Sequence, residues 1–136
     1  MEISVTKQAG RVEVTTLGLS GQLDGQNFQQ VIDKAKELHA SGSRDFVFDM
    51  SDLTYISSAG LVALHTVALM LRGETTPDLD NGWASMKAVK KEVDAKPQQH
   101  MKLFNPRPEV KSVLEMVGFD RVFEIHSSLD KAVQSF

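Results

Sequence analysis

The chain has 136 residues, 41% of them hydrophobic and 24% charged, which is the composition of one ordinary globular domain rather than of a disordered chain. Its formal net charge is −3 and no block of like charges occurs, which argues against non-specific nucleic-acid binding. The absence of cysteine excludes disulfides, thiolate zinc sites and cysteine nucleophiles.

The N-terminal part of the chain has the pattern of strands. Hydrophobic and polar residues alternate along it, which predicts strands with one buried face. Gly10-Arg11 marks a turn between the first two strands, and three glycines in residues 18–25 indicate a loop or strand end around the segment GQLD. The alternating apolar residues are Ile3, Val5, Val12, Val14, Leu17 and Leu19.

A helix and another strand follow. Apolar residues recur at helical spacing after Asn27, a plausible N-cap, and the helix is expected to end at Ser41-Gly42-Ser43. The stretch from Phe46 to Met50 is almost continuously apolar, as expected of a strand that is buried on both faces. The helical positions predicted to be buried are Phe28, Val31, Ile32, Ala35 and Leu38.

A serine pair opens the second predicted helix. Ser57 and Ser58 stand directly before a nearly uncharged run from Ala59 to Arg72, which Gly73 ends. The first turn of a helix carries unpaired backbone N–H groups and the positive end of the helix dipole. Serine is a natural N-cap there, and a phosphate added to it would meet a ready-made anion site. A partner could therefore detect the charge state of one small hydroxyl.

The rest of the chain predicts an insertion and further alternation. Residues 74–99 read as a surface insertion with a short helix in 84–93. The order of elements predicts an α/β sheet with helices on one or both faces. The later elements are a strand with Met101, Leu103 and Phe104, a helix from Pro108 to Gly118, a strand with Val122, Phe123 and Ile125, and a helix capped by Ser127 or Ser128.

Three segments, Gly21–Asp24, Asp49–Leu61 and Leu103–Phe123, together resemble a known family. In this order they resemble a STAS domain of the anti-sigma factor antagonist family. The resemblance implies a single STAS domain over residues 1–136. It would have a mixed β-sheet of four to five strands, about four α-helices, and the insertion 74–99 after the second helix.

The resemblance also implies a phosphorylation switch. In this family an anti-sigma factor with serine kinase activity phosphorylates a serine at the start of the second helix, in a motif such as D-S-S-G-L. Aligned on Gly60-Leu61, the acceptor is Ser58, while Ser57 replaces the usual aspartate and is an alternative acceptor. Unmodified Ser58 would allow binding to the anti-sigma factor, phosphorylation would release it, and a serine phosphatase would reset the switch. The implied partner-binding residues are Asp24, Ser57, Ser58, Ala59, Gly60 and Leu61.

Other interpretations stay open at this point. Ser58 could act only as an N-cap, and Asp24 could be only a turn residue. Asp49 and Asp52, together with Ser51, are better explained as turn and cap residues than as metal ligands. The alternative function is a STAS sensor or scaffold module that binds a nucleotide, a lipid or a signalling complex.

An enzyme is not expected. Ser58 and His65 are seven helical residues apart, roughly 10 Å along the axis, whereas a nucleophile and its base need about 3 Å. The remaining histidines, at 39, 100 and 126, show no ligand spacing, so we expect no metal and no cofactor. The N-terminus lacks the apolar core of a signal peptide, and the apolar run 59–71 is too short to cross a bilayer. The expectation is a cytoplasmic protein without membrane insertion.

Overall fold

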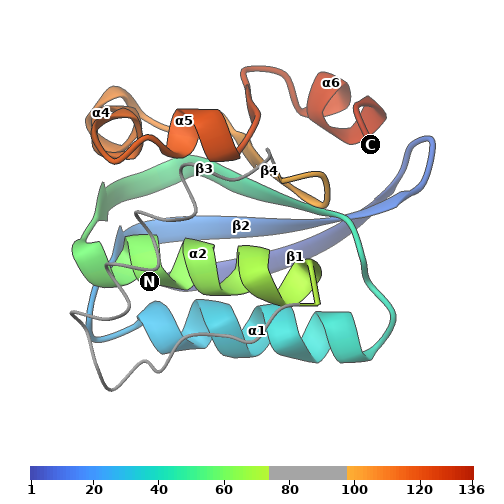
Figure 1. Ribbon diagram of the computed structural model, residues 1–136, viewed down its shortest axis with the longest axis horizontal. Helices are drawn as coiled ribbons and strands as arrows, with labels where there is room; N and C mark the ends of the chain where they lie inside the picture. The colour runs from blue at the N-terminus through green and yellow to red at the C-terminus, as the bar shows by residue number, and fades with distance from the viewer. Residues whose placement is uncertain (74–97) are drawn as a thin grey trace.

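The computed structural model describes residues 1–73 and 98–136, whose five strands form one sheet in the order β1-β2-β3-β4-β5 (Figure 1). The first two strands form an antiparallel hairpin, and the other neighbours are parallel. This confirms the predicted mixed sheet. The strands are β1 (Glu2–Ala9), β2 (Glu13–Leu23), β3 (Phe46–Ile56), β4 (Met101–Phe104) and β5 (Ile125–His126).

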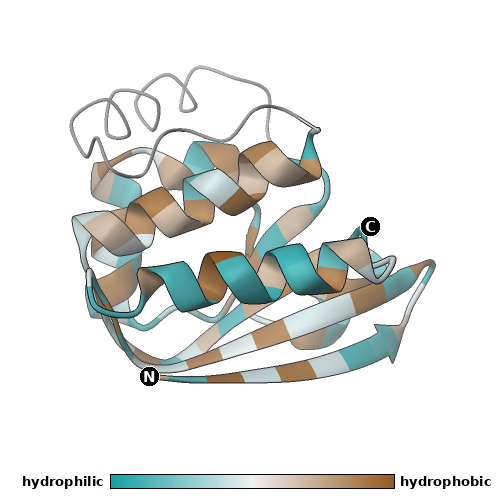
Figure 2. Ribbon diagram, turned by 90° about the horizontal axis from the view of Figure 1, so that it is seen from below, coloured by the Kyte–Doolittle hydropathy of each residue, from teal (hydrophilic) through white to brown (hydrophobic). Residues whose placement is uncertain are grey.

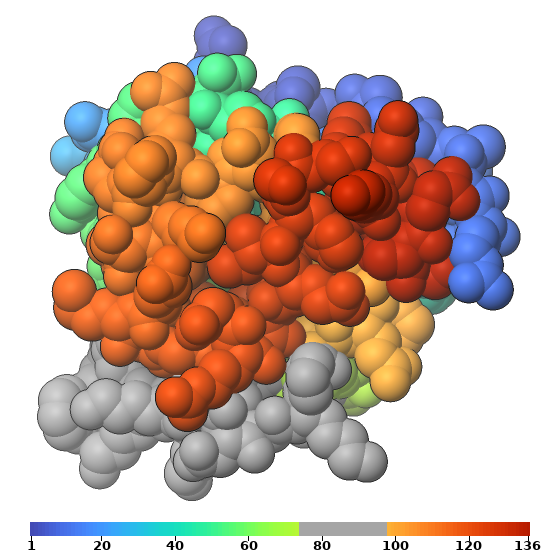
Figure 3. All heavy atoms as spheres, turned by 90° about the horizontal axis from the view of Figure 1, so that it is seen from above, coloured from blue at the N-terminus to red at the C-terminus, as the bar shows by residue number. Residues whose placement is uncertain are grey.

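Helices connect and cover the strands. Figures 1 and 2 show α1 and α2 side by side on one face of the sheet, and Figure 3 shows the C-terminal helices gathered on another side of the molecule. None of the helices in the described part of the chain is long and apolar enough to span a membrane. The helices are α1 (Phe28–Ala40), α2 (Ser58–Leu71), α4 (Pro108–Met116), α5 (Phe119–Val122) and α6 (Leu129–Gln134).

Both faces of β3 are buried from Phe46 to Phe48, as the apolar run predicts. Phe46 and Phe48 lie in the main core, which joins the sheet to α1, α2, α4 and α5. Val47 points the other way, because side chains alternate along a strand, and it packs with Val14 in a second, smaller core. Helix α6 covers that second core with Ala132 and Val133.

Two predictions for strands β2 and β3 have different outcomes. Residues 18–23 belong to β2, so of the predicted loop or strand end the strand end is confirmed, at Leu23, and Gly21 within it has a left-handed backbone with φ 97°. The predicted polar turn after Met50 is wrong, because β3 continues as far as Ile56. Polar side chains such as Asp52 can continue a strand wherever one face of the sheet meets solvent, and β3 has that arrangement beyond Met50.

β1 is far more exposed than its alternating pattern suggests. Val5, predicted on a buried face, keeps 40% of its surface exposed, and Val12 in the hairpin loop keeps 43%. β1 pairs with β2 on one side only within the described residues, so it is an edge strand of the sheet.

The C-terminal elements need two corrections. Val122 lies in α5 and not in a strand, and Phe123 directly follows it, so the last strand contains only Ile125 and His126. The rings of Phe119 and Phe123 meet edge to face at 5.4 Å, which stabilises this short helix in the core. Ser128 caps α6 by accepting a hydrogen bond from the N–H of Lys131. Of the two predicted caps, Ser128 is therefore confirmed and Ser127 is not the N-cap.

The predicted helix 84–93 and most of the insertion lie outside the described residues. Of the last two residues of the insertion, Gln99 is exposed whereas Gln98 is buried. Its side chain donates to the carbonyl of Ala68 at 2.8 Å and its backbone N–H donates to Val122 at 2.7 Å. The predicted glycine stops are confirmed, since Gly73 and Gly118 follow α2 and α4 with φ 77° and 81°.

Candidate functional site at the start of helix α2

The serine pair lies where β2 and β3 end together. Leu23 and Ile56 are partners at the carboxyl ends of these parallel strands. The backbone N–H of Ser57 donates to the carbonyl of Leu23 at 2.9 Å, which ties the start of α2 to the end of β2. Asp24 directly follows Leu23, so the fold brings Asp24 beside the serine pair, as the family resemblance implies. Ligands of open α/β sheets bind at such carboxyl ends.

Ser57, and not Ser58, is the N-cap of α2. Its backbone is extended, with φ −96° and ψ 178°, and its Oγ accepts a long hydrogen bond of 3.4 Å from the N–H of Gly60. Its carbonyl accepts the N–H of Leu61 at 3.0 Å. The interpretation of Ser58 as a simple N-cap is therefore wrong, because its neighbour already has that role.

Ser58 is the first residue of α2 and is exposed. Its hydroxyl has no hydrogen bond to any described residue, whereas Ser57 is half-buried. The first turn of α2 contains no acidic residue that would compete for its N–H groups. The more exposed serine of the pair therefore lies at the electropositive end of an apolar helix.

Gly60 and Leu61 support the site from inside. A Cβ on Gly60 would lie 2.6 Å from Ile56 Cγ1 and 3.0 Å from the carbonyl oxygen of Leu23, so only glycine fits. Leu61 is 3% exposed and belongs to the main core. These two predicted partner-binding residues therefore position the helix end, while the half-buried Ala59 and the exposed Ser58 face outward.

Asp24 orders its own turn. One oxygen of its carboxylate accepts the N–H of Gln26 at 3.0 Å, and its backbone carbonyl accepts the N–H groups of Asn27 and Phe28. Asn27 does not cap α1 with its side chain but binds the N–H of Asp24 at 2.9 Å and the carbonyl of Gln22 at 2.7 Å. The turn interpretation is thus correct, and a role of the half-buried Asp24 in partner binding stays a prediction.

His65 does not form a catalytic pair with Ser58. The imidazole is 1% exposed inside the core, and burial lowers the pKa of His65 to about 4, so the ring is neutral at pH 7. Ser58 is exposed at the end of the same helix. No group of three or more potential metal ligands exists among the described residues.

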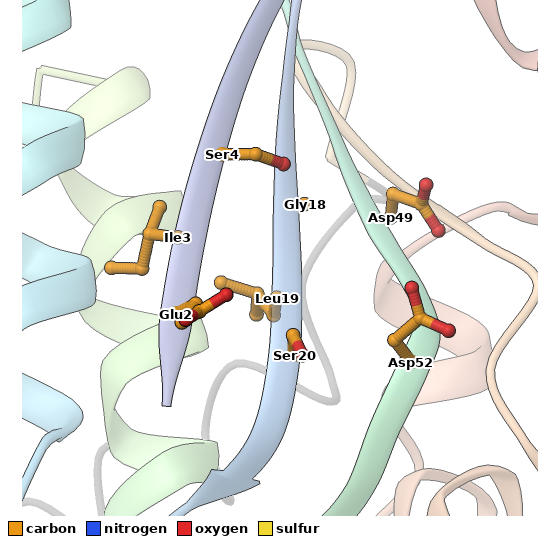
Figure 4. A pocket seen from close by; sticks show the side chains of 8 residues that line it. All are labelled: Glu2, Ile3, Ser4, Gly18, Leu19, Ser20, Asp49 and Asp52. Carbon is orange, nitrogen blue, oxygen red and sulfur yellow. The ribbon is translucent and has the colours of Figure 1, made fainter.

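Sequence reasoning missed a polar pocket on the sheet face away from α1 and α2 (Figure 4). Asp49 and Asp52, interpreted as turn residues, line this cavity of about 290 Å³. Asp49 accepts hydrogen bonds from the N–H and hydroxyl of Ser51, and Arg107 donates to the carbonyl of Ser51 at 2.8 Å. In an unbroken strand Asp49 and Asp52 would lie on opposite faces, so it is the register shift between them in the β2–β3 ladder that brings both carboxylates to one face, and the sequence carries no clear signal of it. The lining residues are Glu2, Ile3, Ser4, Gly18, Leu19, Ser20, Asp49 and Asp52.

Comparison with solved structures finds the same fold in anti-sigma factor antagonists. The antagonist from Mycobacterium paratuberculosis superposes with a TM-score of 0.63 at 16% identity, covering 98% of this chain and 93% of that one. A putative antagonist from Thermotoga maritima gives 0.64 at 16%, covering 88% and 83%. The antagonist SpoIIAA in its unphosphorylated form gives 0.60 at 17%, covering 96% and 93%. At these identities the likeness shows the fold.

Comparison by sequence gives the family. No curated protein matches this chain. A family model described as "Mlab, STAS domain" matches residues 6–77, which is more than half of the chain and includes both Asp24 and the serine pair. The chain therefore belongs to the STAS domain family.

Proposed function

We propose that this protein is an anti-sigma factor antagonist that acts in the cytoplasm. In its unmodified form it binds an anti-sigma factor with serine kinase activity, and phosphorylation of Ser58 releases that partner, which regulates sigma-factor-dependent transcription. The observation that carries the proposal is the division of labour in the serine pair. Ser57 caps α2, which leaves the hydroxyl of Ser58 exposed at the end of the helix.

A phosphate on Ser58 would act locally. It adds roughly −1.5 to −2 charges and three strong acceptor oxygens. The N-terminal end of α2 can receive this charge, and because Ser58 is exposed while Gly60 and Leu61 are packed, the core need not move. In an interface the same phosphate would be poorly hydrated and would be repelled by any carboxylate close to it, so the complex would be weakened.

The geometry favours Ser58 over Ser57 as the acceptor. The Oγ of the half-buried Ser57 accepts the N–H of Gly60, so a phosphate on this oxygen would disturb the N-cap of α2. A phosphate on the Oγ of Ser58 would break no hydrogen bond among the described residues. The protein is thus a substrate and binding partner rather than an enzyme, and a separate serine phosphatase resets it.

The test is the affinity of defined variants for an anti-sigma factor kinase of the same organism, measured by isothermal titration calorimetry. Ser58→Ala keeps the uncharged state and should bind like the wild type. Ser58→Asp places a charge at the same point and should bind at least about tenfold more weakly, a difference of about 1.4 kcal/mol. Ser112→Asp, on the exposed surface of α4, controls for net charge.

Equal affinity of Ser58→Asp and the wild type would contradict the proposal. Purified protein that carries a tightly bound nucleotide or lipid and does not bind the kinase would instead support a sensor module. Mass spectrometry of the intact protein under non-denaturing conditions detects such a ligand directly.

A further inference from the structure

The two edges of the sheet are built differently. At one edge β5 contains only two residues, and a very short edge strand offers little backbone for pairing with another chain. At the other edge β1 has eight residues without proline, and six of them are exposed. Figure 2 shows β1 along the rim of the molecule. An open strand of this length is a template for a further strand.

The hydrogen bonds of β2 show which groups of β1 face outward. The N–H of Thr15 donates to Asp45 at the start of β3, so odd-numbered residues of β2 point their backbone groups toward β3. Even-numbered residues of β2 therefore bond to β1, where they are paired with even-numbered residues such as Ser4 and Thr6. The N–H and C=O groups of Ile3, Val5 and Lys7 consequently lie on the free edge.

We propose that β1 pairs in antiparallel fashion with β1 of a second copy of this chain, with the two-fold axis at Val5. Antiparallel pairing matches residues whose groups face the partner, so odd residues must meet odd residues. Two registers satisfy this condition over seven residues of the strand, one centred on Val5 and one centred on Thr6, and only the first places the exposed Val5 against its own copy. Across the axis the pairs are Val5 with Val5, Ile3 with Lys7, Ser4 with Thr6, and Glu2 with Gln8.

The strand fits a copy of itself in charge and in side chains. No like charges are opposed in this register, because Glu2 meets the amide of Gln8, which can donate to its carboxylate. The methylene stem of Lys7 covers Ile3, and the exposed Val5 side chain gains an apolar neighbour. The two-fold pairing also uses up both long edges and leaves only the two β5 edges, so assembly stops at the dimer.

A cysteine cross-link tests the register, and the chain offers a clean background because it has no cysteine. In a hydrogen-bonded antiparallel pair the Cα atoms are about 5.5 Å apart, within the range of disulfide geometry. Val5→Cys should therefore form a disulfide dimer rapidly, as oxidised glutathione accepts the two electrons and two protons of the thiols. Lys7→Cys is the matched control, since two copies of residue 7 would lie roughly 14 Å apart.

Charge reversal at the axis is the second test. Val5→Lys and Val5→Glu each oppose like charges across the two-fold axis, so each variant alone should be a monomer in sedimentation equilibrium. Their equimolar mixture should return to twice the 15.0 kDa chain mass, as should the wild type. Val12→Lys, an equally exposed valine outside β1, should leave the dimer intact.

The proposal is overturned if the wild type is a monomer at about 1 mM protein, where even a millimolar dissociation constant leaves a detectable dimer. It is also overturned if Lys7→Cys cross-links as fast as Val5→Cys, or if the mixture of charged variants stays monomeric. Phosphorylation of Ser58 does not enter any of these measurements, so their failure would leave the proposed function untouched.

Discussion

Replacing Gly60 with alanine tests how tightly the start of α2 is held against the sheet. The added Cβ would lie 2.6 Å from Ile56 Cγ1, 2.9 Å from Leu23 Cγ and 3.0 Å from the carbonyl oxygen of Leu23. The Ile56 methylene can shift, but the carbonyl cannot move freely because it accepts the N–H of Ser57. The substitution should therefore both overpack the core and loosen the cap.

The expected cost follows from two opposing effects. Overpacking of a core site costs about 1–3 kcal/mol, whereas alanine in place of glycine inside a helix gains up to about 1 kcal/mol. Gly60 lies in the first turn, where the gain is smaller, so we expect a net loss of about 1–2 kcal/mol in the free energy of unfolding. For a chain of this size the melting temperature should fall by about 4–8 °C.

Urea unfolding followed by circular dichroism measures this loss, with Gly25→Ala as the matched control. Gly25 lies in the loop that follows β2, and no atom lies within 4 Å of the Cβ that alanine would add there. That variant should keep the stability of the wild type. A Gly60→Ala variant as stable as the wild type, or an equal loss in both variants, would refute the packing argument.

Three further predictions concern other parts of the fold. Ser57→Ala should cost about 1 kcal/mol of stability through the lost cap, whereas Ser58→Ala should change it by less than about 0.5 kcal/mol, both read from chemical denaturation. Burial lowers the pKa of His65 from 6.5 to about 4, so the unfolded chain takes up a proton before the folded protein does as the pH falls. The free energy of unfolding should therefore drop by about 3 kcal/mol between pH 6.5 and about pH 4 and then level off. A His65→Gln variant should lack this component of the pH dependence, and an unchanged profile would count against a buried neutral ring. Glu124→Gln should destabilise by about 1–2 kcal/mol, because the Lys102 ammonium, 2.7 Å from that carboxylate, is buried. The hydrogen bond from Lys102 lowers the pKa of Glu124, so the stabilisation by this pair is present at neutral pH and should be lost as the pH falls through the lowered pKa. Acid titration of the wild type and of Glu124→Gln would show this loss in the wild type alone.

The sequence predicted the elements with a strong period and missed those in which polar residues continue a strand. Helices α1 and α2 have regular apolar spacing and end at turn residues or glycine, and both are confirmed. Ser51 and Asp52 predict a turn after Met50, but β3 continues, because this part of the sheet exposes one face, which carries polar side chains without ending the strand.

Short apolar segments remained ambiguous for a different reason. The pair Val122-Phe123 fits a strand or a helical turn equally well by pattern, and the contact of Phe123 with Phe119 decides for the turn. The roles within the serine pair depend on the helix starting one residue earlier than expected. Helix ends are the least certain feature of a sequence pattern, so only the structure could assign the cap to Ser57.

The central claim is that Ser58 accepts phosphate while Ser57 caps the helix. Its most direct test is incubation with an anti-sigma factor kinase of the same organism and ATP, followed by tandem mass spectrometry of the peptide that contains both serines. We expect one phosphate, on Ser58, which persists in the Ser57→Ala variant and disappears in Ser58→Ala. Phosphate found on Ser57, or undiminished labelling of Ser58→Ala, would contradict the account.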